Sequence, residues 1–393
     1  MTPSLPSPPI GYHTIHPDVS LNFQINRYFG LAGDVSMLDE MRTVAPRITT
    51  YADWHREFMA LEQQALAKGQ VLKAAYYLRS AEFFLSADDP QRRPMREKFV
   101  QLMRDQFGVK ARDQHRVPYA DGTVLGFLPA YRFTPAHPKG VVLFCGGFDS
   151  YQEELFVFLF WLRDAGYDVV AFEGPGQGGA LFDAGLAMTH KWEKPVAAVL
   201  DHFGFSDVSL IGLSMGGYFA IRAAAFEPRV QRTVAYDVFF DAFDCNLRLM
   251  PVSSQRLLPV LLRLKLDGLV NVMARQAAKR SLLIDWGLNQ AMHVTGTSTP
   301  AAYLHAIQRY TAAEVSSRVT QHVLLLAGSE DHYVPVAQFY KQIAALTHTR
   351  SLTARLFTQA KSAQNHCQAG NFGLALQAIT AWLDAQSAMP QRG

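Results

Sequence analysis

One serine of this chain occurs in a sequence that could make it a nucleophile. The run GLSMG at 212–216, with Ser214 at its centre, follows the apolar stretch 207–211, and a helix is expected to begin near Gly216. A tight turn between a buried strand and a helix exposes the serine hydroxyl beside a general base, as nucleophilic attack requires. A G-x-S-x-G run alone is a weak signal in a chain with 27 glycines, so other residues must support it.

A carboxylate and a histidine follow this serine in the chain order that a Ser-acid-His triad on such a turn requires. The apolar run 322–327 predicts a strand, which leads into the loop GSEDHYVP at 328–335. We predict Asp331 as the acid, with Glu330 as its nearest rival. The structural alternative for Asp331 is a residue that caps a turn.

His366 is the predicted base because of its position between the last expected strand, 352–357, and the last expected helix, 372–386. The chain has 13 histidines, most of which must be surface residues or satisfied polar groups. His332 adjoins the acid and could not easily face it, whereas His348 lies in a polar loop. Both are expected to be solvated.

Two backbone amides could stabilise an oxyanion next to Ser214. The N–H of Met215 lies just after the nucleophile at a helix N-terminus, where the helix dipole favours negative charge. The N–H of Phe148 follows the strand expected over 141–145, in a loop that should approach the nucleophile. We therefore predict Phe148 and Met215 as the backbone donors of an oxyanion hole.

Two nearby sequence patterns are better explained by structural roles than by catalysis or cofactor binding. Ser150 and Glu153 have the S-x-x-E spacing of a capping box for the helix that follows. The cluster at 174–179 formally satisfies G-x-G-x-x-G, but Pro175 removes an amide from the supposed phosphate turn, and no periodic helix begins directly after Gly179. We interpret 174–179 as a surface loop beside the active site.

The length of 393 residues and the composition, with 49% hydrophobic and 18% charged residues, agree with a large soluble enzyme. A net charge of +3 is too small and too dispersed to indicate nucleic acid or an anionic membrane as a partner. The beginning of the chain lacks a secretory pattern, and the apolar run 155–162 is too short to span a bilayer. Three cysteines suit a reducing, cytoplasmic location; Cys145 should pack in a strand, and Cys367 is interpreted as inert.

The pattern divides the chain into a proline-rich lead at 1–20, a helical segment at 21–113 and an α/β region at 114–393. In the helical segment Trp54, Phe58, Leu61 and Ala65 recur at helical spacing. A partner-binding repeat is an alternative, but no fixed period runs through three repeats. A cap over the active site is the preferred interpretation.

The α/β region alternates short apolar strands with helices, which predicts a mostly parallel sheet covered on both faces. The alternation stops after the strand at 233–236, and about 245–317 is largely helical before the sheet resumes at His322. An insertion at this place predicts a lid that brings apolar surface over Ser214.

Taken together, the motifs GGFDSYQEE, FEGPGQGGA, GLSMGG, GSEDHYVP and NHCQAGN, preceded by AAYYLRSAEFF and DDP, resemble the α/β-hydrolases with an N-terminal helical cap. That group includes FrsA-like esterases, dihydroxypseudooxynicotine hydrolase and fungal polyketide-shortening hydrolases. In this family the acid precedes a V-P pair, as Asp331 does. Glu173, where an aspartate is common, and Cys145, where proline is more usual, depart from the pattern.

The resemblance implies a serine hydrolase with the triad Ser214, Asp331 and His366. Hydrolysis of a carboxylic ester on a small or medium-sized hydrophobic molecule is the preferred function, without metal or organic cofactor. The alternatives are hydrolysis of a carbon–carbon bond beside a ketone and a catalytically silent binding protein. Carbon–carbon cleavage would gain from a further acid, for which three acidic residues are candidates, with capping or hinge roles as the alternative: Asp237, Asp241 and Asp244. A homodimer is a possible assembly.

Overall fold

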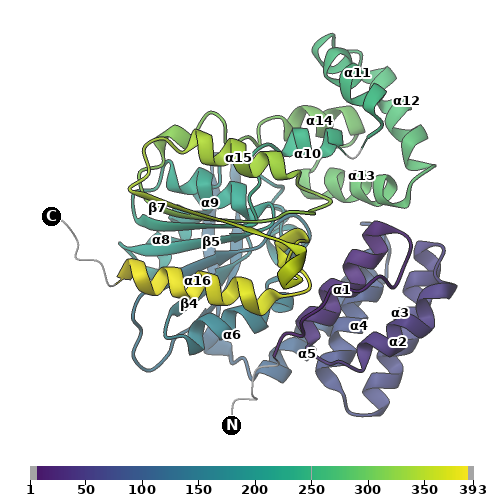
Figure 1. The fold of residues 1–393 in the computed structure, drawn as a ribbon, viewed down its shortest axis with the longest axis horizontal. Helices are drawn as coiled ribbons and strands as arrows, with labels where there is room; N and C mark the ends of the chain where they lie inside the picture. Colours follow the sequence, from purple (N-terminus) through teal and green to yellow (C-terminus); the bar gives the residue numbers. More distant parts are fainter. Residues whose placement is uncertain (1–6, 249, 388–393) are drawn as a thin grey trace.

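The computed structural model describes residues 7–248 and 250–387, and within them eight strands form one sheet in the order β1-β2-β4-β3-β5-β6-β7-β8 (Figure 1). The strands are β1 (Gln114–Asp121), β2 (Val124–Phe133), β3 (Val141–Cys145), β4 (Asp168–Phe172), β5 (Val208–Leu213), β6 (Val230–Tyr236), β7 (His322–Gly328) and β8 (Ser351–Phe357). The pairs from β4 to β8 are parallel, which confirms the predicted mostly parallel sheet.

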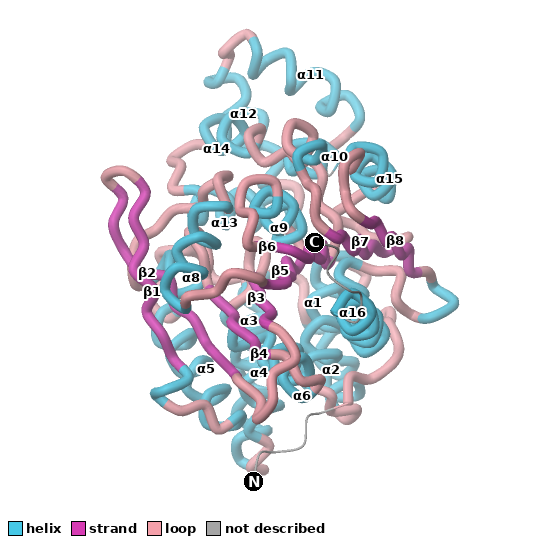
Figure 2. Tube along the Cα trace, turned by 90° about the vertical axis from the view of Figure 1, so that its left-hand side faces the viewer, coloured by secondary structure: helices cyan, strands magenta, loops and turns pink. Residues whose placement is uncertain are grey.

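The antiparallel part of the sheet is a hairpin of β1 and β2 at one edge (Figure 2). Only Gly122 and Thr123 separate the two strands, and Gly122 has the positive φ of 61° that suits a two-residue turn. β1 begins at Gln114. Only Val117 and Tyr119 of its side chains are buried, so this strand has no continuous apolar run in the sequence.

Helices cover both faces of the sheet (Figure 1). α6 (Phe156–Asp164) and α16 (Phe372–Ser387) lie on one face, and α8 (Glu193–Phe203), α9 (Gly216–Ala224) and α15 (Val336–Ala345) lie on the other. The strongly apolar sequence of α6 explains its position, since most of its residues are buried. No helix within the described ranges combines the length and apolar character that a membrane crossing needs.

The predicted capping box of Ser150 and Glu153 is wrong. A short 3-10 helix, Gln152–Leu155, precedes α6, and it is Glu154 whose carboxylate accepts the N–H of Tyr151 at 3.1 Å. Glu153 is buried and accepts the Tyr131 hydroxyl at 2.5 Å instead. The S-x-x-E spacing therefore predicted the start of the helix to within about two residues, but it named Glu153 where Glu154 supplies the capping carboxylate.

The cluster at 174–179 is also not the predicted surface loop, because all of its residues are buried. A short helix, α7 (Gly178–Phe182), begins inside the cluster. A Cβ on Gly176 would approach the Met188 side chain to 2.5 Å, which shows how closely the neighbouring chain packs. The cluster is an internal support for the loop after β3.

From residue 7 onward, five α-helices precede the sheet: α1 (Val19–Ala32), α2 (Met37–Val44), α3 (Tyr51–Ala67), α4 (Val71–Phe83) and α5 (Arg92–Phe107). They pack side by side beside the sheet (Figure 1), and the apolar positions at helical spacing, such as Trp54 and Phe58, are fully buried. α1 starts at Val19, slightly before the predicted segment. Residues 1–6 of the predicted lead lie outside the described residues.

A second helical segment lies between β6 and β7 and consists of α10 (Ala242–Arg248), α11 (Val252–Arg263), α12 (Asp267–Ala278), α13 (Leu282–Thr295) and α14 (Pro300–Ile307). It contacts the N-terminal helices through α13. The Trp286 ring stacks on Phe83 with a centroid distance of 4.8 Å, and the Tyr51 hydroxyl donates to the Leu282 carbonyl. The two helical segments therefore meet, although β1 to β6 separate them in the chain.

Candidate active site

Ser214 lies in the two-residue turn between the end of β5 at Leu213 and the start of α9 at Gly216. Its φ of 61° is in the left-handed region, which costs a non-glycine residue roughly 1–3 kcal/mol and is maintained only by surrounding structure. Its N–H donates to the Tyr236 carbonyl on β6 at 2.6 Å. The turn holds the serine at the carboxyl edge of the sheet.

The glycines of this turn are required by close backbone approach. A Cβ on Gly212 would lie 1.8 Å from the Gly216 carbonyl oxygen, and a Cβ on Gly216 would lie 2.8 Å from the Gly146 carbonyl oxygen. Neither atom can move without moving the backbone that carries it. The G-x-S-x-G pattern thus reflects the packing of β5, α9 and the loop after β3.

The structure brings Ser214, His366 and Asp331 together. His366 Nε2 is 2.8 Å from Ser214 Oγ, and His366 Nδ1 is 2.6 Å from Asp331 Oδ2. Asp331 follows β7, and the backbone N–H groups of Tyr333 and Val334 donate to its other oxygen at 2.7 and 2.9 Å. Its rival Glu330 points to an exposed position and makes no such contact with His366.

Opposite charges on His366 and Asp331 stabilise each other inside the protein. Burial by itself would lower the pKa of His366, but the Asp331 carboxylate and the neighbouring Cys367 together outweigh it and raise that pKa well above its ordinary value. Burial opposes ionisation of Asp331 too, yet contact with His366 and the donated N–H groups keep its pKa below the ordinary value. This arrangement stabilises a positively charged imidazole beside Ser214.

The loop after β3 lies against the serine turn. A Cβ on Gly147 would approach the Ser214 Cβ to 2.8 Å and the Met215 nitrogen to 3.0 Å. Phe148 and Met215, the predicted oxyanion donors, line the same pocket as Ser214. Met215 also lies at the N-terminus of α9, as expected.

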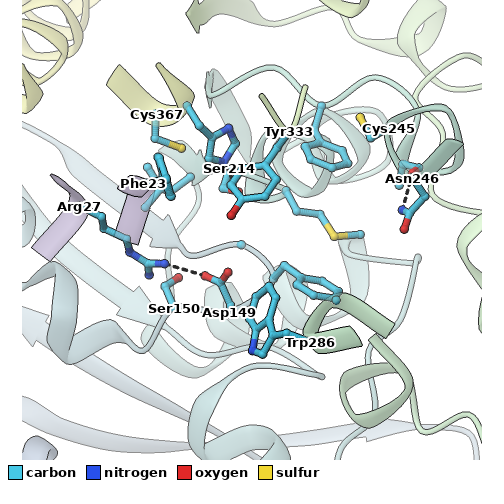
Figure 3. Close-up of a pocket in the computed structure, with 18 of the residues that line it drawn as sticks. Phe23, Arg27, Asp149, Ser150, Ser214, Cys245, Asn246, Trp286, Tyr333 and Cys367 are labelled. Carbon is cyan, nitrogen blue, oxygen red and sulfur yellow. Dashed lines mark hydrogen bonds and ion pairs between the residues drawn. The ribbon is translucent and has the colours of Figure 1, made fainter. Parts of the chain in front are cut away.

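An apolar pocket opens next to Ser214, with walls from three parts of the chain (Figure 3). α1 contributes Phe23 and Arg27, the loop after β3 contributes Phe148, and the segment between β6 and β7 contributes Trp286. The Phe23 ring lies 6.0 Å from the His366 ring, centroid to centroid. Arg27 donates to Asp149 at 3.1 Å on the pocket wall.

Sequence reasoning missed the pocket residues on α1. Phe23, Arg27 and Leu31 all line the pocket, and their spacing of four residues places them on one face of a helix. An arginine within an otherwise apolar helical stripe was a signal that could have identified this face. The sequence also gave no indication of Gln177, whose side-chain amide donates to the carbonyls of Gly146 and Gly147 at 2.7 and 2.8 Å.

The three additional acidic candidates are not among the pocket-lining residues of the described chain. Asp241 accepts the N–H of Asp244 at 2.9 Å, which is a helix-capping contact at the start of α10. Asp244 forms ion pairs with Lys341 and Arg248 at 3.5 and 3.6 Å. The contact of Asp241 agrees with the capping alternative, whereas Asp244 takes part in ion pairs.

Asp237 is different because it lies next to the triad residues. Its carboxylate accepts the N–H groups of Val238 and Cys367 at 2.8 and 3.2 Å, and oxygen or nitrogen atoms of Asp237, Asp331 and His366 lie within 4.8 Å of one another. Burial and the neighbouring Asp331 carboxylate raise its pKa well above the ordinary value. The residue connects the end of β6 to the loop that carries His366.

Four further expectations concern two histidines and two cysteines, and one of them is wrong. The prediction of a solvated His332 is wrong: its ring packs between Phe23 and Tyr333, with centroid distances of 4.9 and 3.9 Å, and burial lowers its pKa to about 4. His348 is exposed, as predicted. Cys145 is fully buried in β3, and burial raises the pKa of Cys367, which agrees with its inert interpretation.

Comparison with known proteins identifies the family. Residues 141–359 match the alpha/beta hydrolase family, over more than half of the chain. The chain belongs to this family. Hydrolase acrC of Aspergillus aculeatus is 30% identical over 380 residues, which cover 85% of this chain and 88% of that protein. The chain is thus a hydrolase, and the resemblance inferred from its motifs is confirmed.

Two solved structures show the same fold over nearly the whole chain. AbyA5 superimposes with a TM-score of 0.66 at 19% identity and covers 92% of this chain and 93% of its own. The 2,6-dihydroxy-pseudo-oxynicotine hydrolase gives a TM-score of 0.60 at 22% identity and covers 91% and 94%. The fold that this chain shares with these two structures therefore extends over its N-terminal helices.

Proposed function

We propose that this hydrolase is a serine esterase that cleaves carboxylic esters of a small or medium-sized hydrophobic molecule through an acyl-enzyme. The observation that carries the proposal is the continuous series of contacts from Ser214 through His366 to Asp331, with the serine facing an apolar pocket. A serine hydroxyl within reach of an imidazole that is oriented by a carboxylate is the arrangement that acyl transfer needs.

In the proposed reaction His366 Nε2 removes the proton from Ser214 Oγ as that oxygen attacks the ester carbonyl. Asp331 orients the imidazole and stabilises its positive charge, which agrees with the raised pKa of His366. The N–H groups of Phe148 and Met215 hold the oxyanion. The protonated imidazole then gives its proton to the leaving alkoxide, and water attacks the acyl-enzyme by the same route.

The pocket favours an apolar acyl or alcohol group with a limited polar part. Aromatic and aliphatic side chains from both helical segments form most of its wall, including Phe23, Leu31 and Trp286. Arg27 is the one arginine or lysine among the described residues that line it, and it is paired with Asp149. A substrate oxygen could hydrogen-bond at this pair while the rest of the molecule remains in apolar surroundings.

This same arginine favours one alternative, the hydrolysis of a carbon–carbon bond beside a ketone. Attack of Ser214 on one carbonyl of a 1,3-diketone would break the bond to the central carbon and leave its electron pair on an enolate. The enolate needs a proton and gains from a nearby positive charge. Arg27 could supply that charge, and protonated His366 could supply the proton.

Labelling with a fluorophosphonate, followed by a screen of short and long esters, amides and 1,3-diketones, tests the proposal. We expect stoichiometric labelling of Ser214 and highest kcat/KM on hydrophobic esters. Ser214→Ala and His366→Ala should each lower kcat by at least ~10³-fold and retain the fold. Absence of labelling would favour a binding protein, and turnover confined to diketones would favour the carbon–carbon alternative.

A further inference from the structure

Gln177, in the buried cluster before α7, contacts the loop that carries Phe148. Its side chain is buried, and its amide nitrogen donates to the carbonyl oxygens of Gly146 and Gly147 at 2.7 and 2.8 Å. Its amide oxygen accepts the N–H of Gly174 at 2.9 Å. Every polar atom of this side chain therefore bonds to backbone, and two of the three bonds fix the loop after β3.

The contact with Gly147 determines the direction of the Phe148 amide. The carbonyl of Gly147 and the N–H of Phe148 belong to one peptide group, which is planar and trans, so the two bonds point in opposite directions. Holding the oxygen on the side of Gln177 directs the N–H away from Gln177. The serine turn packs against the same glycine, since a Cβ on Gly147 would lie 2.8 Å from the Ser214 Cβ and 3.0 Å from the Met215 nitrogen.

The N-terminal helices hold the Asp149–Ser150 peptide group, further along the same loop. Arg79 on α4 donates to the carbonyl oxygen of Asp149 at 2.8 Å, and Arg27 on α1 donates to the Asp149 carboxylate at 3.1 Å. Both arginines also bond to the buried carboxylate of Glu154, at 2.6 Å each. The backbone on either side of Phe148 is thus fixed by side chains from different parts of the chain.

We propose that Gln177 is a positioning residue that holds the Gly147–Phe148 peptide group so that the Phe148 N–H faces the oxyanion formed at Ser214. The inference rests on the proposed serine-hydrolase function. Gln177 does not line the pocket, so it acts through the loop. Its loss should affect the transition state, where the oxygen carries negative charge, more than the binding of substrate.

Gln177→Met tests this role, because methionine preserves length and removes both donated hydrogen bonds. We expect kcat on the best oxoester to fall about 10- to 100-fold, less than the ~10²–10³-fold typical when an oxyanion donor is lost outright, with KM changed less than about threefold. The measurement that separates this role from a purely structural one is the ratio of kcat/KM on the oxoester to kcat/KM on a matched thionoester. Its sulfur accepts hydrogen bonds poorly, so the preference for oxoester over thionoester should shrink by a similar factor.

Gln152→Met is the matched control. Gln152 is equally buried in the same region and donates to the Phe172 carbonyl at 2.8 Å, with no hydrogen bond to Gly147. We expect it to keep the oxoester preference of the unmodified protein. An unchanged kcat and preference in Gln177→Met, or an equal loss of preference in Gln152→Met, would overturn the proposal.

Gln177→Glu provides a second measurement if the methionine variant does not fold. A protonated glutamic acid can donate to the Gly147 carbonyl, whereas a carboxylate cannot. Its kcat should therefore fall as pH rises, opposite to the rise expected as His366 loses its proton. A pH profile like that of the unmodified protein would contradict the proposal. Failure of the proposed function itself is distinguishable, since Ser214→Ala would then retain activity.

Discussion

At the scale of the residue, the proposed chemistry depends on the two nitrogens of His366. Nδ1 contacts the Asp331 carboxylate, so it carries the hydrogen, and Nε2 is left free to accept the proton of Ser214. The base is active only when the imidazole is neutral. Because Asp331 raises the pKa of His366 above its ordinary value, activity should decline as pH falls through a value above 6.5.

Asp331→Asn tests this electrostatic link. Removal of the carboxylate removes the interaction that raises the pKa of His366, so the acid limb of the kcat/KM profile should move to lower pH. The value of kcat should fall by about 10²–10⁴-fold because the imidazole loses its orienting partner. Glu330→Gln is the control and should leave the profile unchanged. A larger loss in Glu330→Gln would mean that Glu330 is the acid.

A second prediction concerns the acidic residues after β6. None lines the pocket, so Asp237→Asn, Asp241→Asn and Asp244→Asn should each lower kcat/KM on the best ester by less than about tenfold, or about 1.4 kcal/mol. The raised pKa of Asp237 makes asparagine a close mimic of its protonated form. Steady-state kinetics on an ester and a diketone would measure this. A ~10²-fold loss on the diketone with normal folding would favour carbon–carbon cleavage.

The sequence could predict residues whose spacing follows from chain order. Ser214 directly follows β5, Asp331 lies in the loop after β7 and His366 lies in the segment after β8, and parallel strands bring such positions to one edge of the sheet. Gln177 could not be found in this way. Its role consists of hydrogen bonds to backbone carbonyls 30 and 31 residues earlier, and any residue type can supply a carbonyl.

At the scale of the element, two helical segments enclose the pocket from opposite sides. Phe23 on α1 reaches the His366 ring, and Trp286 on α13 stacks on Phe83 of α4. The periodicity of each segment predicted that it is helical, because that pattern depends on local sequence. It did not predict that the segments meet, because contact between positions about 200 residues apart depends on the whole fold.

Deletion of residues 1–113 should expose the apolar surface that these contacts bury. Tyr76 donates to the Glu154 carbonyl at 2.9 Å, and Phe83 and Phe84 both pack against Trp286. We expect the truncated protein to aggregate or to lose selectivity between esters, as measured by size-exclusion chromatography and kinetics. A monodisperse fragment with unchanged kinetics would instead indicate an independent partner-binding module.

At the scale of the whole molecule, buried charge connects the N-terminal helices to the hydrolase fold. Glu154 follows β3, has a fully buried side chain and accepts hydrogen bonds from Arg27 and Arg79. Arg79 also pairs with Glu82 on its own helix. Long-range ion pairs of this kind leave no mark in the sequence, since the partners are about 75 to 127 residues apart.

Glu154→Gln should be strongly destabilising, because it leaves two buried guanidinium groups without their shared carboxylate. Removing one member of a buried ion pair typically costs about 3–5 kcal/mol in the free energy of unfolding. Urea denaturation followed by circular dichroism would measure the change. Asp39→Asn removes an exposed ion pair with Arg42 and should leave the urea concentration at the midpoint of unfolding nearly unchanged. Equal effects of the two variants would contradict a stabilising role for the buried network.

Because Cys145, Cys245 and Cys367 are buried, the rate at which a reagent modifies their thiols would report how often the folded protein opens locally. All three thiols are free and buried, and burial raises the pKa of each, so the folded chain offers a reagent such as Ellman's almost no thiolate. Because Cys145 is the last residue of β3, Cys245 lies in α10 and Cys367 adjoins His366, their separate rates of modification would rank the opening of the sheet, the inserted helices and the histidine loop without any introduced label.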